Sequence, residues 1–190
     1  GRWEKFHRPV MTSHTYKLYA YDPVLKKMIY CERGCTFIFD PVSCDWQRVL
    51  PLPFPSGGWR PKLCTTPSGV LAWGTTARRS GGRKAGPLWR FDHRSLRWQP
   101  FDTAGQPGDA PGHDNGTAVY DSKRNRLLLF AGGRGKFNKA WAYDLTSGKL
   151  TPLEPANRPA GKVFIRESIY LPSADLVMFA SAADAGAHVY

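Results

Sequence analysis

The stretch "LLLFAGGRGKFNKAWAYDLTSGKL", residues Leu127–Leu150, determines how the rest of the chain is interpreted. An apolar run ends at Gly132-Gly133, a short basic segment follows, and apolar and polar residues then alternate as far as Tyr143-Asp144. Alternation with a period of two is typical of a half-buried strand, and glycine pairs are typical of connections. The stretch therefore predicts two β-strands, with the glycine pair standing where the first strand leaves its sheet.

An internal repeat shows that these strands belong to a larger unit. The aromatic–aspartate pair Tyr143-Asp144 recurs as Phe91-Asp92 and Phe39-Asp40, at a constant spacing of 52 residues. Each copy is preceded by an apolar run and, before that, by a further strand that leads into a turn. A fourth copy covers "RESIYLPSADLVMFASAADAGAHVY", residues 166–190. Large apolar side chains stand six residues after each aspartate, namely Trp46, Trp98 and Leu150.

Each unit is predicted to be four short strands joined by turns rich in Asp, Pro, Asn, Ser and Gly. Units of about 50 residues with four strands are blades of a β-propeller, in which neighbouring blades bury each other's faces. The 13% aromatic content fits this interpretation, because wide rings fill the wedge between twisted sheets. We therefore expect a single all-β domain over residues 1–190. Its expected parts are a strand at 1–8, blades at 14–50, 62–101 and 113–153, and a partial blade at 164–190 that the N-terminal strand completes.

The third unit resembles a kelch repeat, whose pattern is a glycine pair, a variable loop and a strand with Trp and Tyr. Gly132-Gly133, Trp141 and Tyr143 match that pattern. The second unit keeps Trp89, Phe91 and Trp98 but has Gly74-Thr75 in place of the glycine pair, and the first unit keeps Phe37, Phe39 and Trp46 without glycines. The resemblance implies a kelch-like propeller of about four blades, similar to galactose-oxidase-like kelch domains. The four blades either close into a ring or form an arc of a larger propeller.

Metal and cofactor chemistry is not predicted for this chain. The kelch resemblance includes copper enzymes of the galactose-oxidase type, which need two histidine ligands and a tyrosine crosslinked to cysteine. The five histidines are scattered over separate turns and blades, and no phosphate-binding loop or nucleophile elbow is present. We therefore predict no metal ligands, no cofactor and no catalytic residues, although His113-Asp114 could orient a ligand or act as a base.

The net charge of +12 points to an acidic partner or a polyanion, or else simply to a basic solvated surface. Because strands alternate in direction, the loops after the second and fourth strands of every blade lie on one face of a propeller. Those loops hold most of the excess basic residues, including four in "GTTARRSGGRKAGP", whereas acids and bases nearly balance on the opposite face. The predicted ligand-binding residues of the basic loop face are Trp59, Arg60, Arg78, Arg79, Arg83, Lys84, His113, Asp114, Arg134, Lys136 and Lys139.

We expect a non-catalytic scaffold that presents this face to a protein partner, an acidic glycan or another polyanion. The alternatives are a sugar-directed enzyme with an axial pocket on the same face and a fragment of a larger multi-subunit propeller. Nucleic acid is a possible partner that we do not favour, because the repeat assigns nearly all aromatic residues to the core rather than to base stacking. No stretch is long and apolar enough to span a bilayer, and no signal peptide is visible. The resemblance suggests export if the source is bacterial; the sequence leaves the compartment open.

The four cysteines form no metal-binding spacing. Cys31 and Cys35 flank a predicted hairpin loop, where they either face each other in a disulfide or act as small buried apolar residues.

Overall fold

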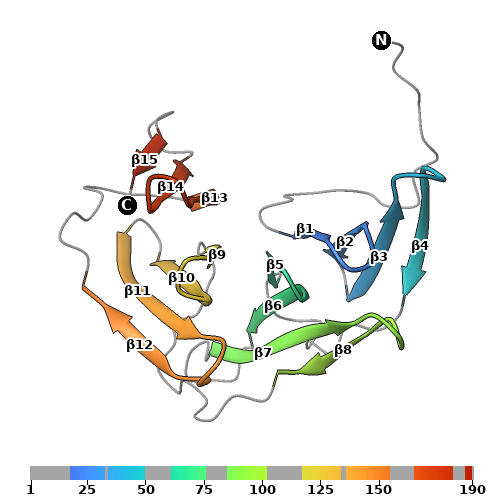
Figure 1. Ribbon diagram of the computed structural model, residues 1–190, viewed down its shortest axis with the longest axis horizontal. Helices are drawn as coiled ribbons and strands as arrows, with labels where there is room; N and C mark the ends of the chain where they lie inside the picture. Colours follow the sequence, from blue (N-terminus) through green and yellow to red (C-terminus); the bar gives the residue numbers. More distant parts are fainter. Residues whose placement is uncertain are drawn as a thin grey trace.

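The computed structural model describes residues 18–32, 34–49, 61–75, 85–101, 117–133, 136–154, 165–181 and 187–189. The regular structure in these ranges is all β-strand (Figure 1). The strands are β1 (Tyr19–Asp22), β2 (Lys27–Glu32), β3 (Cys35–Asp40), β4 (Asp45–Val49), β5 (Lys62–Thr66), β6 (Gly69–Thr75), β7 (Ala85–Asp92), β8 (Arg97–Pro100), β9 (Thr117–Asp121), β10 (Arg126–Gly133), β11 (Lys136–Asp144), β12 (Leu150–Leu153), β13 (Ile165–Leu171), β14 (Leu176–Ser181) and β15 (Ala187–Val189).

Strands consecutive in the sequence form four antiparallel sheets. Sheet 1 contains β1–β4, sheet 2 contains β5–β8, sheet 3 contains β9–β12, and sheet 4 contains β13–β15 as its three described strands. The sheets follow one another around an arc, with β1, β5, β9 and β13 toward its middle and β4, β8 and β12 on its outer side (Figure 1). The first strands of neighbouring sheets contact each other, β1 with β5, β5 with β9, and β9 with β13. This arrangement confirms an all-β, propeller-like fold built from repeated antiparallel sheets.

Most tight turns between consecutive strands are held by an aspartate at the end of the preceding strand. Asp22 Oδ1 accepts hydrogen bonds from the backbone N–H groups of Val24 and Leu25, at 2.9 and 3.0 Å. Such a carboxylate replaces the backbone partners that the turn cannot supply. Four residues after Asp22, Lys26 adopts the left-handed conformation with a φ of 57°. We call this arrangement the aspartate-capped turn; the same pattern occurs after Asp40, Asp92, Asp121 and Asp144, with left-handed Cys44, Leu96, Asn125 and Gly148.

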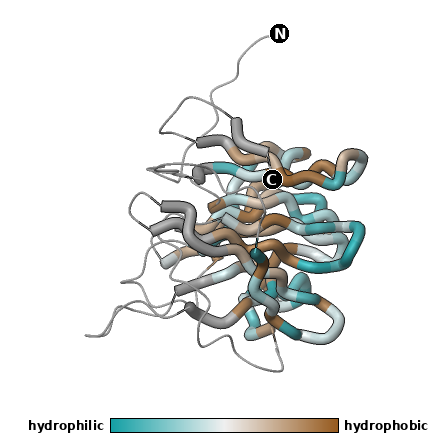
Figure 2. The backbone as a smooth tube through the Cα atoms, turned by 90° about the vertical axis from the view of Figure 1, so that its left-hand side faces the viewer, coloured by the Kyte–Doolittle hydropathy of each residue, from teal (hydrophilic) through white to brown (hydrophobic). Residues whose placement is uncertain are grey.

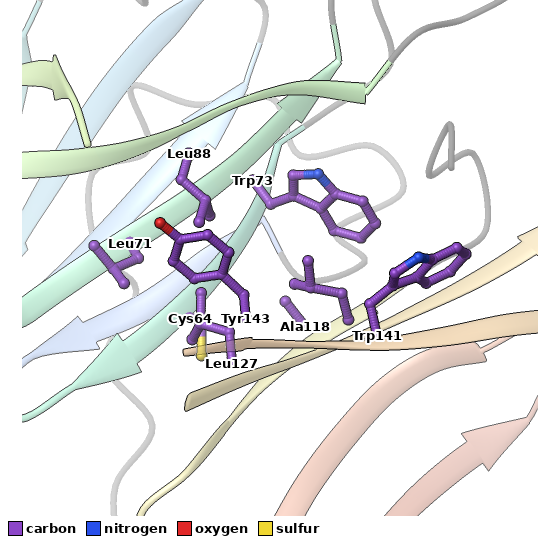
Figure 3. Packing of buried hydrophobic residues seen from close by; sticks show 9 residues of the cluster. Cys64, Leu71, Trp73, Leu88, Ala118, Leu127, Trp141 and Tyr143 are labelled. Carbon is purple, nitrogen blue, oxygen red and sulfur yellow. The ribbon is translucent and has the colours of Figure 1, made fainter. Parts of the chain in front are cut away.

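The core lies between neighbouring sheets, as the aromatic repeat predicts. Between sheets 2 and 3, Trp73 and Leu88 of sheet 2 pack with Trp141 and Tyr143 of sheet 3 (Figure 3). Burial of a large aromatic side chain of this kind contributes about 2–3 kcal/mol. Equivalent clusters join the other sheets: Ala20, Ile29, Cys31 and Ile38 of sheet 1 with Leu63, Phe91 and Trp98 of sheet 2, and Val119, Leu128 and Phe130 of sheet 3 with Tyr170, Val177 and Phe179 of sheet 4.

The two ends of the arc carry large side chains that no described sheet covers. Tyr19 and Tyr21 of β1 are 41% and 46% exposed, and Ile169 and Met178 of sheet 4 are 50% and 38% exposed. Tyr19 and Glu167 interact across the two ends: burial of Tyr19, the nearby Glu167 charge and a hydrogen bond to Glu167 raise the pKa of the Tyr19 hydroxyl. The first strands of sheets 1 and 4 therefore come within side-chain reach of each other.

The strand register bears on two local expectations. The glycine pair stands at the end of β10, as the sequence predicts, because β10 ends at Gly133; Gly132 and Gly133 are still paired with Phe137 and Lys136, across a register shift after Ala131. The disulfide alternative for Cys31 and Cys35 is wrong. Cys31 lies opposite Thr36, so Cys35 points to the other face of sheet 1, and all four cysteines are free. Cys31 and Cys35 accordingly belong to separate core clusters, as small buried residues.

Candidate functional site

The strand topology gives the four sheets two distinct edges. We call one edge the turn face. It carries two turns of each sheet, the turn between the first and second strands and the turn between the third and fourth strands. We call loop face the opposite edge, where the second strand ends and the third begins. Figure 2 shows the described turns of the turn face gathered on the right of the view and largely hydrophilic. The loop face corresponds to the predicted basic face.

Paired strand ends hold the predicted basic segments at the loop face. Thr75 lies opposite Ala85, so the segment 76–84 leaves and re-enters sheet 2 at one place. Gly133 lies opposite Lys136, so the chain between them, which includes Arg134, likewise leaves and re-enters sheet 3 at one place. Because the strands are antiparallel, the connection after β6 and the connection after β10 lie at the same edge of their sheets. The backbone of the described strands therefore brings the two ends of each basic segment to the loop face.

Of the predicted ligand-binding residues, Lys136 and Lys139 fall within a described element. They belong to β11, opposite Gly133 and Ala131 in β10. The other predicted residues lie outside the described ranges: Trp59, Arg60, Arg78, Arg79, Arg83, Lys84, His113, Asp114 and Arg134.

The carboxylates of the turn face are engaged by the protein itself. Hydrogen bonds from the backbone amides of Val42 and Ser43, together with Lys27, lower the pKa of the Asp40 carboxyl. The Lys27 ammonium lies 3.1 Å from Asp40. Backbone amides of the turns also lower the pKa of the Asp92 and Asp144 carboxyls. These negative charges are therefore paired locally and contribute to turn structure.

A polar network joins sheets 3 and 4 on the turn face. Arg124 binds Asp175 through two nitrogen–oxygen contacts of 2.7 and 2.6 Å and reaches buried Asp121 at 3.1 Å. Arg126 donates to the same Asp121 oxygen at 2.8 Å, and the Tyr170 hydroxyl donates to Asp175 at 2.6 Å. Burial opposes ionisation of Asp121, but the two arginines hold its pKa below the usual value. Arg124 and Tyr170 likewise lower the pKa of Asp175.

A second polar link joins sheets 1 and 2. His93 Nε2 lies 2.9 Å from Oδ2 of Asp22, whose side chain is fully buried. Gly69 packs beneath this pair, because a Cβ atom there would lie 2.6 Å from His93 Nε2. Thr65 adds a hydrogen bond to the Tyr21 carbonyl at 2.8 Å.

The sequence analysis predicted neither of these two links between sheets. His93 lies in the turn between β7 and β8, on the turn face. Asp22 at the end of β1 was visible as a turn residue, but its partner His93 lies 71 residues away, and Asp175, the distant partner of Arg124, lies 51 residues from it. Sequence spacing alone carries no signal for them.

The described residues contain no group of three or more His, Cys, Asp or Glu side chains placed to hold a metal ion. In the same residues, no helix is long and apolar enough to cross a membrane.

Comparison with known proteins supports the fold alone. No family model and no curated protein matches the chain. Among solved structures, the chain is similar to the crystal structure of TolB from Acinetobacter baumannii, with a TM-score of 0.53 and 13% sequence identity. The match covers 90% of this chain and 39% of the TolB chain, so this chain spans well under half the length of that protein. The likeness supports a propeller-like fold; the kelch resemblance stays a prediction.

Proposed function

We propose that the protein is a non-catalytic binding scaffold whose loop face recognises an acidic partner, either a protein surface, an acidic glycan or another polyanion. The observation that carries this proposal is the difference between the two faces. On the turn face, carboxylates are matched by turn amides or by cations such as Lys27 and Arg124. Paired strand ends bring the flanks of the basic segments to the loop face, where we expect their cations to make a field of one sign that attracts an anion.

The proposal is tested by removing equal charge from each face. The loop variant carries Arg78→Gln, Arg79→Gln, Arg83→Gln and Lys84→Gln together. The control carries Lys26→Gln, Arg94→Gln, Lys123→Gln and Lys149→Gln, four exposed cations of the turn face. Binding to a sulfated polysaccharide at low salt is measured for both. We expect the loop variant to bind at least about tenfold more weakly and with a smaller salt dependence, while the control stays within about twofold of the parent. Equal losses in the two variants would contradict a binding role for the loop face.

We also propose that the four sheets close into a ring. The Tyr19–Glu167 hydrogen bond already links the two ends of the arc. The open face of sheet 1 is aromatic and that of sheet 4 is largely aliphatic, the same combination that packs between the sheets inside the arc. A closed ring should sediment as a monomer at all accessible concentrations, whereas an arc of a larger assembly would self-associate through its apolar ends.

A further inference from the structure

The first strands of the four sheets lie toward the middle of the arc, and each runs from the loop face to the turn face (Figure 1). They end at Asp22, Thr66, Asp121 and Leu171. The residues three and four places before these ends are equivalent in the four sheets and lie toward the loop face. We call them the inner positions; they are Tyr19 and Leu18, Leu63 and Lys62, Ala118 and Thr117, and Ser168 and Glu167.

A buried contact between two inner positions joins sheets 3 and 4. The hydroxyl of Thr117, four places before the end of β9, lies 2.7 Å from the hydroxyl of Ser168, three places before the end of β13. Both residues are buried. Two small hydroxyl side chains therefore fill this place between neighbouring sheets and leave no room for a ligand.

The equivalent contact between sheets 4 and 1 is accessible instead. Glu167, four places before the end of β13, accepts a hydrogen bond from Tyr19, three places before the end of β1. Tyr19 is 41% exposed, and Glu167 is partly exposed. The other inner positions are all buried, namely Leu18, Lys62, Leu63, Thr117, Ala118 and Ser168. Among the inner positions, a ligand can thus reach Tyr19 and Glu167.

This pair combines an exposed aromatic ring with a carboxylate. The face of a tyrosine ring packs against apolar C–H groups, and a carboxylate accepts several hydrogen bonds but donates none. A sugar ring matches both, because it has a C–H face and neighbouring hydroxyl donors. An ammonium group would also suit a ring and a carboxylate, but the net charge of +12 repels a cation. The charge of the chain therefore favours a sugar.

We propose that Tyr19 and Glu167 form a sugar subsite for an acidic glycan at the inner end of the loop face. A sugar ring packs its C–H face against Tyr19, and its hydroxyls donate hydrogen bonds to Glu167 in place of the Tyr19 hydroxyl. The acidic groups of the same glycan meet the basic segments of the loop face. This inference rests on the proposed loop-face function and narrows its partner to an acidic polysaccharide.

Two anionic polymers of equal charge test the subsite. Oligogalacturonate carries its carboxylates on sugar rings with free hydroxyls, whereas oligoglutamate carries its carboxylates without sugar rings. At low salt, we expect the parent protein to bind oligogalacturonate at least about tenfold more tightly, because that polymer alone supplies sugar hydroxyls to Glu167. Equal affinities for the two polymers would overturn the sugar subsite and would favour an acidic protein segment as the partner.

Glu167→Gln separates the subsite from simple charge attraction. The substitution removes a negative charge, so attraction between charges alone predicts tighter binding of both polymers. The subsite predicts about tenfold weaker binding of oligogalacturonate, because a charged hydrogen-bond acceptor is lost, and no loss for oligoglutamate. Glu154→Gln is the matched control, since Glu154 is exposed and follows β12 on the loop face. Tighter binding of oligogalacturonate by Glu167→Gln would contradict the proposal.

Tyr19→Ala tests the contact between the sugar ring and the aromatic ring. It should weaken oligogalacturonate binding about fivefold to tenfold, and Tyr19→Phe, which keeps the ring, should restore most of the affinity. Tyr21→Ala is the control, because Tyr21 lies on the same side of β1 and is 46% exposed but stands nearer the turn face. Equal losses for Tyr19→Ala and Tyr21→Ala would mean that no sugar ring packs on Tyr19.

The loop variant of the preceding test distinguishes failure of the subsite from failure of the loop-face function. Suppose that it binds both polymers weakly, while Tyr19→Ala and Glu167→Gln bind them as the parent does. The loop face is then a polyanion site without a sugar subsite. If the parent binds neither polymer, or if the loop variant binds both as the parent does, the loop-face function and the subsite are both refuted.

Discussion

At the scale of single residues, Gly69 is a position where the backbone tolerates little change. Its φ of +121° is strained for any residue with a side chain, and an added Cβ atom would lie 2.6 Å from His93 Nε2 and 3.3 Å from Asp22 Oδ2. His93 can rotate away only by losing its hydrogen bond to buried Asp22. Gly69 therefore couples the turn between β5 and β6 to the link between sheets 1 and 2.

Gly69→Ala should destabilise the protein by about 2–3 kcal/mol, the sum of backbone strain and the lost hydrogen bond. Urea unfolding measures this change. Gly34→Ala is the control, because Gly34 has a φ of +75° but no atom within 4 Å of an added Cβ, and it should cost only about 1 kcal/mol. Equal costs at the two positions would mean that the contact with His93 contributes nothing.

Individual residues also show which features of the fold could be predicted from the sequence and which could not. The aromatic positions Phe91, Trp98, Trp141 and Tyr143 were predicted as core from a repeat, and all four are buried between sheets. The contacts of Asp22 with His93 and of Arg124 with Asp175 could not be predicted, because the partners lie 71 and 51 residues apart and the choice of partner depends on how sheets pack. The site expectation rests on residues such as Arg78 and Trp59, outside the described ranges, and so stays a prediction.

At the scale of elements, the aspartate-capped turn is the recurring unit. It combines one carboxylate that accepts two backbone amides with one left-handed residue four positions later. The glycine pair Gly132-Gly133, the clearest turn signal in the sequence, stands at the end of β10 and marks none of these aspartate-capped turns. The left-handed positions were not visible in the sequence because Lys26, Cys44 and Leu96 occupy them, residues that carry no turn signal of their own.

The left-handed position predicts a stabilising substitution. Cys44 is exposed and has a φ of 56°, a conformation that is easier for glycine. Cys44→Gly should raise stability by about 0.5 kcal/mol, after allowance for the greater freedom of glycine in the unfolded chain. Gly148→Ala, at the same position of another turn, should lower stability by about 1 kcal/mol. Chemical unfolding of both variants checks the signs, and two changes of the same sign would refute this explanation.

At the scale of the whole molecule, the turn face makes stability sensitive to acid. The pKa values of Asp40, Asp92, Asp121, Asp144 and Asp175 are all held below the usual value by hydrogen bonds and cations. A group whose pKa is lower in the folded state stabilises the protein above its unfolded pKa, about 4, and this contribution disappears as pH falls through the folded value. Stability should therefore decline steadily below about pH 5.

Asparagine substitutions isolate this effect, because an asparagine oxygen can still cap a turn but does not titrate. In the double variant Asp92→Asn, Asp144→Asn, the free energy of unfolding should depend less steeply on pH between about 5 and 2 than in the parent. Urea midpoints measured across that range give both slopes. Indistinguishable slopes would show that these carboxylates are not the source of the acid sensitivity.

The aspartate-capped turn also has a kinetic consequence. All of its partners lie within five residues of one another, so a hairpin can close on this turn before any distant sheet is in place. Local contacts of this kind form in microseconds, whereas packing one sheet on the next must wait for a much longer stretch of chain to come together. We expect the hairpins to appear first during folding and the joining of the sheets to limit the rate.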